Sequence, residues 1–182
     1  MQDINTARLV LRNFTADDGA ELFDYLAKPR VNCFLADRVS SIEQAVDKAK
    51  ARSQDDTMIA VCQKDTGALI GELFLRKEEP DTFSVGWHFN AKVAGKGYAI
   101  ESAKTLLHYL FTEKDARRIY AYVEDDNHRS QQLCEKLYMR KEACFMEFIS
   151  FTNNADGTLK YENTFQYAIL KKEWLRSLNS AS

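Results

Sequence analysis

Apolar side chains recur along this chain with the two periods that distinguish strands from helices. Residues 8–14 alternate leucine with arginine, the pattern of a strand covered on one face. Residues 15–18 then offer a capping start for a helix that Pro29 ends, and residues 40–43 begin a second amphipathic helix. We therefore expect one strand followed by two helices.

The rest of the chain is richer in strands. The same periodicities predict, in order, strands at residues 58–62, 68–75 and 82–89, a helix with its apolar face at residues 99–110, a strand at 118–123, a helix at 130–137, and strands at 145–151 and 164–170. The aromatic side chains of the last two strands are interpreted most simply as the core of a final hairpin. This order predicts one mixed α/β (α+β) domain spanning residues 1–182.

Composition and charge narrow the range of functions. The 182 residues are enough for one domain with a sizeable core, and 45% hydrophobic with 29% charged residues is typical of a soluble globular protein. A net charge of −2 and the lack of a basic cluster argue against a nucleic-acid partner, and no apolar run reaches the roughly 18 residues of a membrane helix. The four cysteines and three histidines lack metal-ligand spacing, so we expect no metal and free thiols in the cytoplasm.

The clearest chemical signal is the segment Gly95-Lys96-Gly97, between the strand at 82–89 and the next helix. Two glycines let the backbone approach a ligand closely, and a helix start directs unpaired N–H groups outward. This geometry suits a phosphate, although the glycines would equally serve a plain bend. There is no G-x-x-x-x-G-K-[ST], and G-x-G-x-x-G fails because Ile100 replaces its third glycine, so a nucleotide-hydrolysing loop and a dinucleotide site lose support.

The order of elements and five short motifs resemble the GNAT superfamily of N-acetyltransferases over nearly the whole chain. The motifs are Thr6-Ala-Arg-Leu-Val-Leu-Arg12, Val85-Gly-Trp87, Gly95-Lys-Gly-Tyr-Ala99, Asn127-x-x-Ser130 with Glu135-Lys-Leu137, and Tyr167-Ala-Ile-Leu-Lys-Lys-Glu-Trp174. They are most similar to the branch that acetylates the N-termini of ribosomal proteins. The resemblance implies a GNAT-like single domain with a central, mostly antiparallel twisted sheet of about seven strands and about four flanking helices.

The same resemblance implies acetyl-CoA as cosubstrate and assigns its contacts. Backbone groups of Trp87, His88 and Phe89 would pair with the pantetheine arm, and their N–H groups would form the oxyanion hole. The pyrophosphate would be wrapped by Gly95, Lys96, Gly97, Tyr98, Ala99 and Ile100. Asn127 would hydrogen-bond the pantetheine arm, with Ser130 close to the same place.

Five positions depart from the family pattern. Ala94 stands where arginine or glutamine is usual in the pyrophosphate loop, which leaves Lys96 as a partial substitute for the missing charge. Cys134 replaces a frequent tyrosine acid, and Tyr122 stands where some members have a glutamate base. Tyr138 and the following methionine replace Gly-Phe, which predicts a differently built turn after that helix.

The general base is left open between two carboxylates and a histidine. Glu72 lies in an apolar strand, with a place on the solvent face as its alternative interpretation. Glu124 lies two residues after Tyr122, so both side chains point to the same side of the strand, and Glu124 could act as the base. Alternatively it is a solvated charge. The following pair, Asp125-Asp126, is expected to cap the next helix. His88 titrates in a suitable range but is more often structural on a sheet.

We therefore expect an acyltransferase that moves the acetyl group of acetyl-CoA to a primary amine by direct attack in a ternary complex. The acceptor would be a protein N-terminus or a small-molecule amine, and the aromatic hairpin would in part line its groove. The enzyme is expected in the cytoplasm, away from membranes, as a monomer or homodimer. The alternative is a GNAT-fold protein that binds acetyl-CoA with little or no turnover and acts as a sensor or partner.

Overall fold

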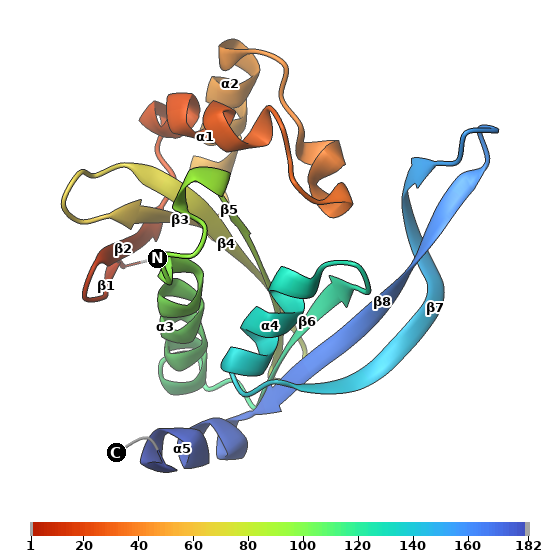
Figure 1. Ribbon diagram of the computed structural model, residues 1–182. Coiled ribbons are helices and arrows are strands. Elements are labelled where there is room, and N and C mark those ends of the chain that lie inside the picture. The colour runs from red at the N-terminus through yellow and green to blue at the C-terminus, as the bar shows by residue number, and fades with distance from the viewer. Residues whose placement is uncertain (1, 181–182) are drawn as a thin grey trace. The chain divides into compact units, whose positions relative to one another are not determined.

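The computed structural model describes residues 2–180, and its elements follow the expected order with one addition at each end (Figure 1). The strands are β1 (Ile4–Asn5), β2 (Leu9–Asn13), β3 (Met58–Gln63), β4 (Leu69–Glu78), β5 (Thr82–Phe89), β6 (Arg118–Glu124), β7 (Arg140–Asn153) and β8 (Leu159–Leu170). The α-helices are α1 (Gly19–Leu26), α2 (Ile42–Ser53), α3 (Tyr98–Thr112), α4 (His128–Lys136) and α5 (Lys171–Ser180). Short 3₁₀ helices are η1 (Ala16–Asp18), η2 (Asn32–Asp37) and η3 (Ala91–Val93).

The strands form one eight-stranded sheet in the order β1-β2-β3-β4-β5-β6-β8-β7. Antiparallel pairing joins β1 to β2, β2 to β3, β3 to β4, β6 to β8 and β8 to β7, whereas β5 and β6 run parallel with Thr82–Ser84 beside Arg118–Tyr120. The fold is therefore the predicted mixed α/β class with a mostly antiparallel sheet. The two-residue β1 and the helix α5 are the elements that the sequence pattern did not indicate.

The chain divides into two compact units. The first contains the residues up to Leu75 together with Trp87–Thr105, and the second contains Arg76–Gly86 together with the residues from Leu106 onward. β4, β5 and α3 each have residues in both units. None of the helices in the described part of the chain combines the length and the apolar composition needed to span a lipid bilayer.

The first unit is built on the apolar faces of α1, α2 and the early strands. Leu9 and Leu11 of β2 are fully buried, which confirms the alternation in the sequence. A Cβ atom on Gly19 would lie 2.6 Å from Cγ2 of Val46, so the close contact of α1 with α2 requires glycine there. The hydrophobic core of this unit consists of Phe14, Leu22, Tyr25, Leu26, Val39, Ala45, Ala49, Ala60, Cys62 and Leu69.

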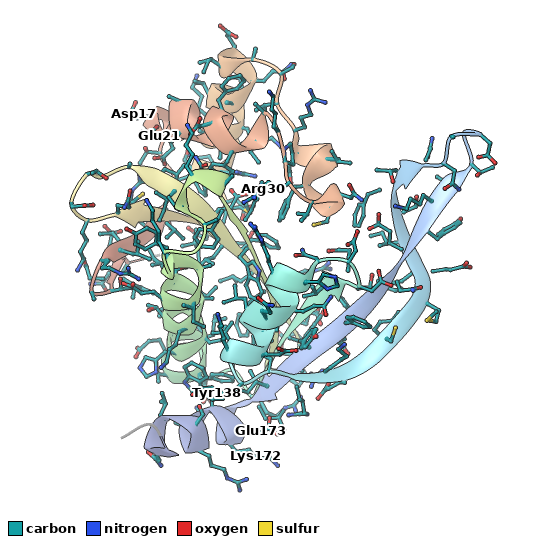
Figure 2. The ribbon with its side chains drawn as sticks, viewed as in Figure 1. Asp17, Glu21, Arg30, Tyr138, Lys172 and Glu173 are labelled. Atoms are coloured by element: carbon teal, nitrogen blue, oxygen red, sulfur yellow. The ribbon has the colours of Figure 1, made fainter. Side chains whose placement is uncertain are left out.

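The second unit has its core beneath β6 and β8. Alternate residues Ile119, Ala121 and Val123 of β6 are buried, as a one-sided strand requires. Trp174 of α5 is 1% exposed and its ring lies 5.9 Å from that of Phe111. The carboxylate of Glu173 accepts the N–H of Leu170 at 2.8 Å, which caps the start of α5, where Figure 2 shows Glu173 beside Lys172.

The long hairpin β7–β8 corrects the interpretation of its aromatic residues as core. Phe148 and Tyr161 are 51% and 54% exposed, whereas Tyr167 is buried at the end near α5. Figure 1 shows that β7 and β8 continue as a two-stranded arm, so much of their surface has no third layer to pack against. Cys144 of β7 is exposed as well, with its Sγ 3.7 Å from Sδ of Met146.

Candidate functional site

The glycine loop before α3 has the backbone that the sequence suggested. Gly95 and Gly97 have φ values of +79° and +81°, in the left-handed region that favours glycine. A Cβ atom on Gly95 would meet nothing within 4 Å, and one on Gly97 would lie 3.3 Å from Nη2 of Arg8. The first hydrogen bond of α3 runs from the N–H of Glu101 to the carbonyl of Gly97, so the amides between them have no acceptor one turn earlier in the helix. The loop therefore presents an open backbone surface with N–H donors.

Arg8 brings a second positive charge to this loop. Its Nη1 donates to the carbonyl of Lys96 at 3.0 Å, and its guanidinium carbon lies 4.6 Å from the ring centre of Tyr98. Its Nε donates to Glu101 at 2.7 Å, and the hydroxyl of Thr6 donates to the same carboxylate at 2.6 Å. This contact explains the Thr-x-Arg opening of the chain. Arg8 is not among the site residues predicted from the sequence, because 88 positions along the chain separate it from Lys96.

The carboxylate that holds Arg8 is partly buried in the contact. Burial acts to raise the pKa of Glu101, but hydrogen bonds from Thr6 and Arg8 outweigh it and hold that pKa below its usual value of 4.5. The group is therefore ionised at neutral pH. The Thr6–Arg8–Glu101 contact ties the N-terminal segment to the first turn of α3.

The end of β5 lies against β4 at very short range. A Cβ atom on Gly71 would lie 2.6 Å from the carbonyl oxygen of His88 and 2.5 Å from Cδ1 of Phe89. Only glycine allows this approach, which fixes the backbone of β5 where Trp87, His88 and Phe89 follow one another. The first unit thus contains the two predicted backbone segments, residues 87–89 and 95–100.

Glu72 lies inside the first unit and not on the solvent face that was its alternative interpretation. It is 1% exposed; its Oε2 is bound by Nη1 of Arg52 and accepts the hydroxyl of Tyr25 at 3.3 Å. Its Oε1 lies 3.7 Å from Nδ1 of His88, whose ring stacks on Phe34 with centroids 4.0 Å apart. Burial and the nearby Glu72 charge raise the pKa of Tyr25 well above its usual value, so this residue is a neutral donor.

Asn127 is the N-cap of α4. Its Oδ1 accepts the N–H of Ser130 at 3.2 Å, so the two residues expected to contact one ligand lie together. The prediction that Asp125 and Asp126 cap this helix is wrong. The carboxylate of Asp125 instead accepts Nδ2 of Asn163 on β8 at 2.8 Å.

Cys134 lies in the interior of the second unit. It is fully buried, and this burial raises the pKa of its thiol to about 12. The thiol therefore stays protonated at neutral pH. Cys134 also accepts, at its carbonyl, the N–H of Met139 at 3.0 Å at the end of α4.

The turn after α4 is the glycine-type turn even though tyrosine occupies it. Tyr138 has φ +59°, and its N–H donates to the carbonyl of Glu135 at 2.9 Å. Together with the bond between Met139 and Cys134, this is a Schellman motif, in which the left-handed position is usually glycine. The expectation of a differently built turn is therefore wrong: the sequence changes, and Tyr138 adopts the strained conformation. Figure 2 shows Tyr138 beyond the end of α4.

Glu124, the other candidate base, ends β6 and is half-buried. It pairs in register with Thr164 of β8, which pairs in turn with Phe145 of β7. Tyr122, two residues earlier on the same face, is 44% exposed. The second unit therefore brings together Glu124, Asn127 and Ser130 around the β6–α4 connection. Within the described residues there is no group of three or more His, Cys, Asp or Glu side chains placed to hold a metal ion.

Comparison with known proteins decides which family this site belongs to. The model of the GNAT acetyltransferase domain matches residues 8–140, which include the Arg8 contact, the glycine loop, Glu124 and α4. The chain belongs to the GNAT acetyltransferase family. The protein is therefore an enzyme, and its general activity is the transfer of an acetyl group.

Relatives match over nearly the full length. The uncharacterized N-acetyltransferase YnaD of Bacillus subtilis (strain 168) is 31% identical, with 94% of this chain and 98% of that protein covered. The crystal structure of a GNAT-family acetyltransferase from Bacillus anthracis has 28% identity and a TM-score of 0.84, covering 94% of this chain and 100% of the other. A putative ribosomal-protein-serine acetyltransferase from Vibrio cholerae has 19% identity and a TM-score of 0.75 over 92% and 97% of the two chains, a likeness of fold.

Proposed function

We propose that the protein transfers the acetyl group of acetyl-CoA to a primary amine by direct attack in a ternary complex. The observation that carries this proposal is the left-handed glycine loop at the start of α3, which is open at Gly95 and has Arg8 against Gly97. A free backbone surface with N–H donors, together with the cationic side chains of Arg8 and Lys96, fits a pyrophosphate. Membership of the family indicates acetyl transfer, and this loop supports CoA as the carrier of the acetyl group.

The contacts with acetyl-CoA follow from the same residues. Within the first unit, residues 95–100 bind the pyrophosphate, and backbone groups of Trp87, His88 and Phe89 hold the pantetheine arm and polarise the thioester carbonyl. Arg8 brings guanidinium N–H donors to the loop in which Ala94 has none, while its charge is balanced by Glu101. Asn127 and Ser130 of the second unit are proposed contacts of the pantetheine arm, with Nδ2 of Asn127 as the donor because Oδ1 caps α4.

The need for a base depends on the acceptor. A lysine-like amine with a pKa of about 10.4 costs roughly 4.6 kcal/mol to hold neutral at pH 7, and an α-amine with a pKa near 8 costs about 1.4 kcal/mol. We propose Glu124 as the base, supported by its half-buried place at the end of β6. Glu72 is a weaker candidate for the base, because its carboxylate is already bound by Arg52 and Tyr25. We assign it a structural role inside the first unit, as the buried partner of Arg52 and Tyr25.

Cys134 is a poor proton donor to the leaving thiolate. A thiol with a pKa of about 12 would give its proton to a thiolate of pKa near 8.5 only at a cost of about 5 kcal/mol. We propose that Cys134 packs the interior behind α4 and that solvent protonates the CoA thiolate.

The test is a screen of primary amines with acetyl-CoA, in which release of CoA is followed over pH 6.5–9.5. With an alkylamine acceptor, Glu124→Gln should lower the rate at pH 7 and leave a smaller difference at pH 9.5, where neutral amine is supplied directly. Glu72→Gln should change the rate by a similar factor at every pH. Equal profiles for Glu124→Gln and the native enzyme would exclude Glu124, and a pH-dependent loss in Glu72→Gln would transfer the role to Glu72 and His88.

The same screen tests the non-enzymatic alternative. Calorimetry should show acetyl-CoA binding, and at least one amine should release CoA. Binding without release for any amine would support a sensor or partner instead. For location we propose the cytoplasm, which supplies acetyl-CoA and keeps thiols reduced.

A further inference from the structure

Three aromatic rings form an exposed platform on the second unit. They are Tyr122 of β6 with Phe145 and Phe148 of β7, and their centroids lie 5.1, 5.7 and 6.0 Å apart. Tyr122 and Phe148 are 44% and 51% exposed. Tyr120, which is buried, supports the edge of the platform at 5.3 Å from Tyr122. Aromatic side chains bury apolar area when they can, so a cluster of this exposure points to a ligand.

A bulge in β7 holds this platform in place. Phe145 pairs with Thr164 and Ile149 pairs with Glu162, so four steps along β7 face two along β8. Within the bulge Glu147 has φ +48°, a strained conformation for a side chain other than glycine. The bulge is the segment that carries Phe148 to the ring of Tyr122.

Asn163 fixes the bulge to the β6–α4 connection. The N–H of Glu147 donates to Oδ1 of Asn163 at 2.9 Å, and Nδ2 of Asn163 donates to Asp125 at 2.8 Å. The N–H of Asp125 donates back to the carbonyl of Asn163 at 3.0 Å. One hydrogen bond thus holds Glu147 to Asn163, two more hold Asn163 to Asp125, and the platform is placed relative to the end of β6.

The charges around the platform favour a cation. Glu124 and Glu162 lie on the same face of the sheet in adjacent pairing rows, and Glu147 lies in the bulge itself. The arginines of this face, Arg118 and Arg140, lie at the other end of the strands and are paired with Glu142. Aromatic faces attract cations through their negative quadrupole, and carboxylates add to that attraction.

A buried hydroxyl group, without a hydrogen-bond partner in the part of the chain that the structure describes, lies between the carboxylates and the aromatic rings. Thr164 is 2% exposed, and its Oγ1 has no hydrogen-bond partner within the described residues. It occupies the row between Glu124 and Phe145. A buried hydroxyl without a partner is costly, so a ligand group at this place would satisfy it.

The form of β7 favours a small ligand over a peptide. β7 is the last strand of the sheet, the position where a peptide adds as a further strand. Its pairing with β8 shifts register at three places, and such bulges disturb the regular edge that strand addition needs.

We propose that the platform binds the acceptor as a small organic ammonium ion, held over Tyr122, Phe145 and Phe148 beside the carboxylate of Glu124. This inference rests on the proposed function, because it makes the platform the acceptor subsite. It narrows the substrate class from primary amines in general to small cationic alkylamines.

The test uses binding probes that do not react. Choline and its neutral isostere 3,3-dimethylbutan-1-ol are titrated into the native protein, with binding followed by NMR. Choline should bind more tightly than the isostere by about 2- to 30-fold, the range of cation–π contributions. Phe148→Leu keeps the apolar contact and should remove most of that preference. Tyr161→Leu, an exposed aromatic of the same hairpin outside the platform, should keep it.

The following outcomes would overturn the proposal. Equal binding of choline and the isostere, or no binding of either, would show that the platform does not recognise cations. If an alanyl peptide shifts the NMR signals of the platform residues and choline does not, the platform binds a peptide and not an ammonium ion. Choline should also compete with the alkylamine that gives the fastest acetyl transfer. If no amine is acetylated and choline still binds, the proposed function fails but the ammonium site stands; if transfer occurs without competition, only the platform fails.

Discussion

A matched pair of glycines separates the cost of backbone strain from the loss of acetyl-CoA binding. Gly95 in the loop before α3 and Gly67 in the β3–β4 turn have φ values of +79° and +72°. A Cβ atom on either would meet nothing within 4 Å. Alanine at each position therefore brings the same strain and no clash. A left-handed residue other than glycine costs about 1–2 kcal/mol, partly offset by the smaller entropy of the unfolded chain.

We predict that Gly95→Ala and Gly67→Ala each lower the free energy of unfolding by about 1 kcal/mol. Gly95→Ala alone should weaken acetyl-CoA binding, since the methyl group keeps the pyrophosphate from the N–H donors. Losing one hydrogen bond to a charged group is worth about 1.5–3 kcal/mol, or roughly a 10- to 150-fold rise in Kd. Urea denaturation gives the first quantity and calorimetry the second. An unchanged Kd in Gly95→Ala, or an equal loss in Gly67→Ala, would refute the assignment of the loop.

Three further predictions follow from individual contacts. Tyr138→Gly should raise the free energy of unfolding by about 0.5–1 kcal/mol by relieving the left-handed strain, whereas Tyr138→Ala should not, as measured by denaturation. Because its pKa is lowered in the folded state, Glu101 contributes stability that is present above pH 4.5 and lost as pH falls below it; thermal unfolding of Glu101→Gln should therefore show a weaker decline over that window. Cys134→Ala should cost about 1–2 kcal/mol of stability through a small cavity and lower the initial rate less than about thirtyfold; complete inactivity of a folded variant would contradict its packing role.

The fold was predictable because the periodicities of the helices and strands are strong. Leu9 and Leu11 show the burial that their alternation predicts, and the order of elements needed no long-range information. The single domain stays a prediction, supported by β4, β5 and α3 having residues in both compact units. The hairpin aromatics were misread because strand periodicity shows which residues share a face but not whether a third layer covers that face.

The backbone conformation of the glycine loop could be predicted from the sequence, whereas most side-chain contacts of the candidate site could not. The pattern of Gly95 and Gly97 is local, so the sequence shows it directly. Arg8 reaches the same loop through tertiary contacts, and Arg52 pairs with Glu72 across 20 positions, which no local pattern reveals. Tyr138 shows that the sequence can also mislead in the opposite direction. Tyrosine disfavours a left-handed turn, but the turn still forms because the hydrogen bonds with Glu135 and at Met139 fix the backbone at the end of α4.

The exposed Cys144 has a practical consequence for kinetics. Burial raises the pKa of the Cys62 and Cys134 thiols to about 11 and 12, so neither is a ready nucleophile near neutral pH. Cys144 is open to solvent on β7. A chromogenic disulfide added to report liberated CoA will also derivatise this thiol, and more slowly the half-buried Cys33, and release dye before any turnover. That early absorbance would imitate the burst of a covalent acyl-enzyme, and Cys144→Ser removes the contribution of the exposed thiol.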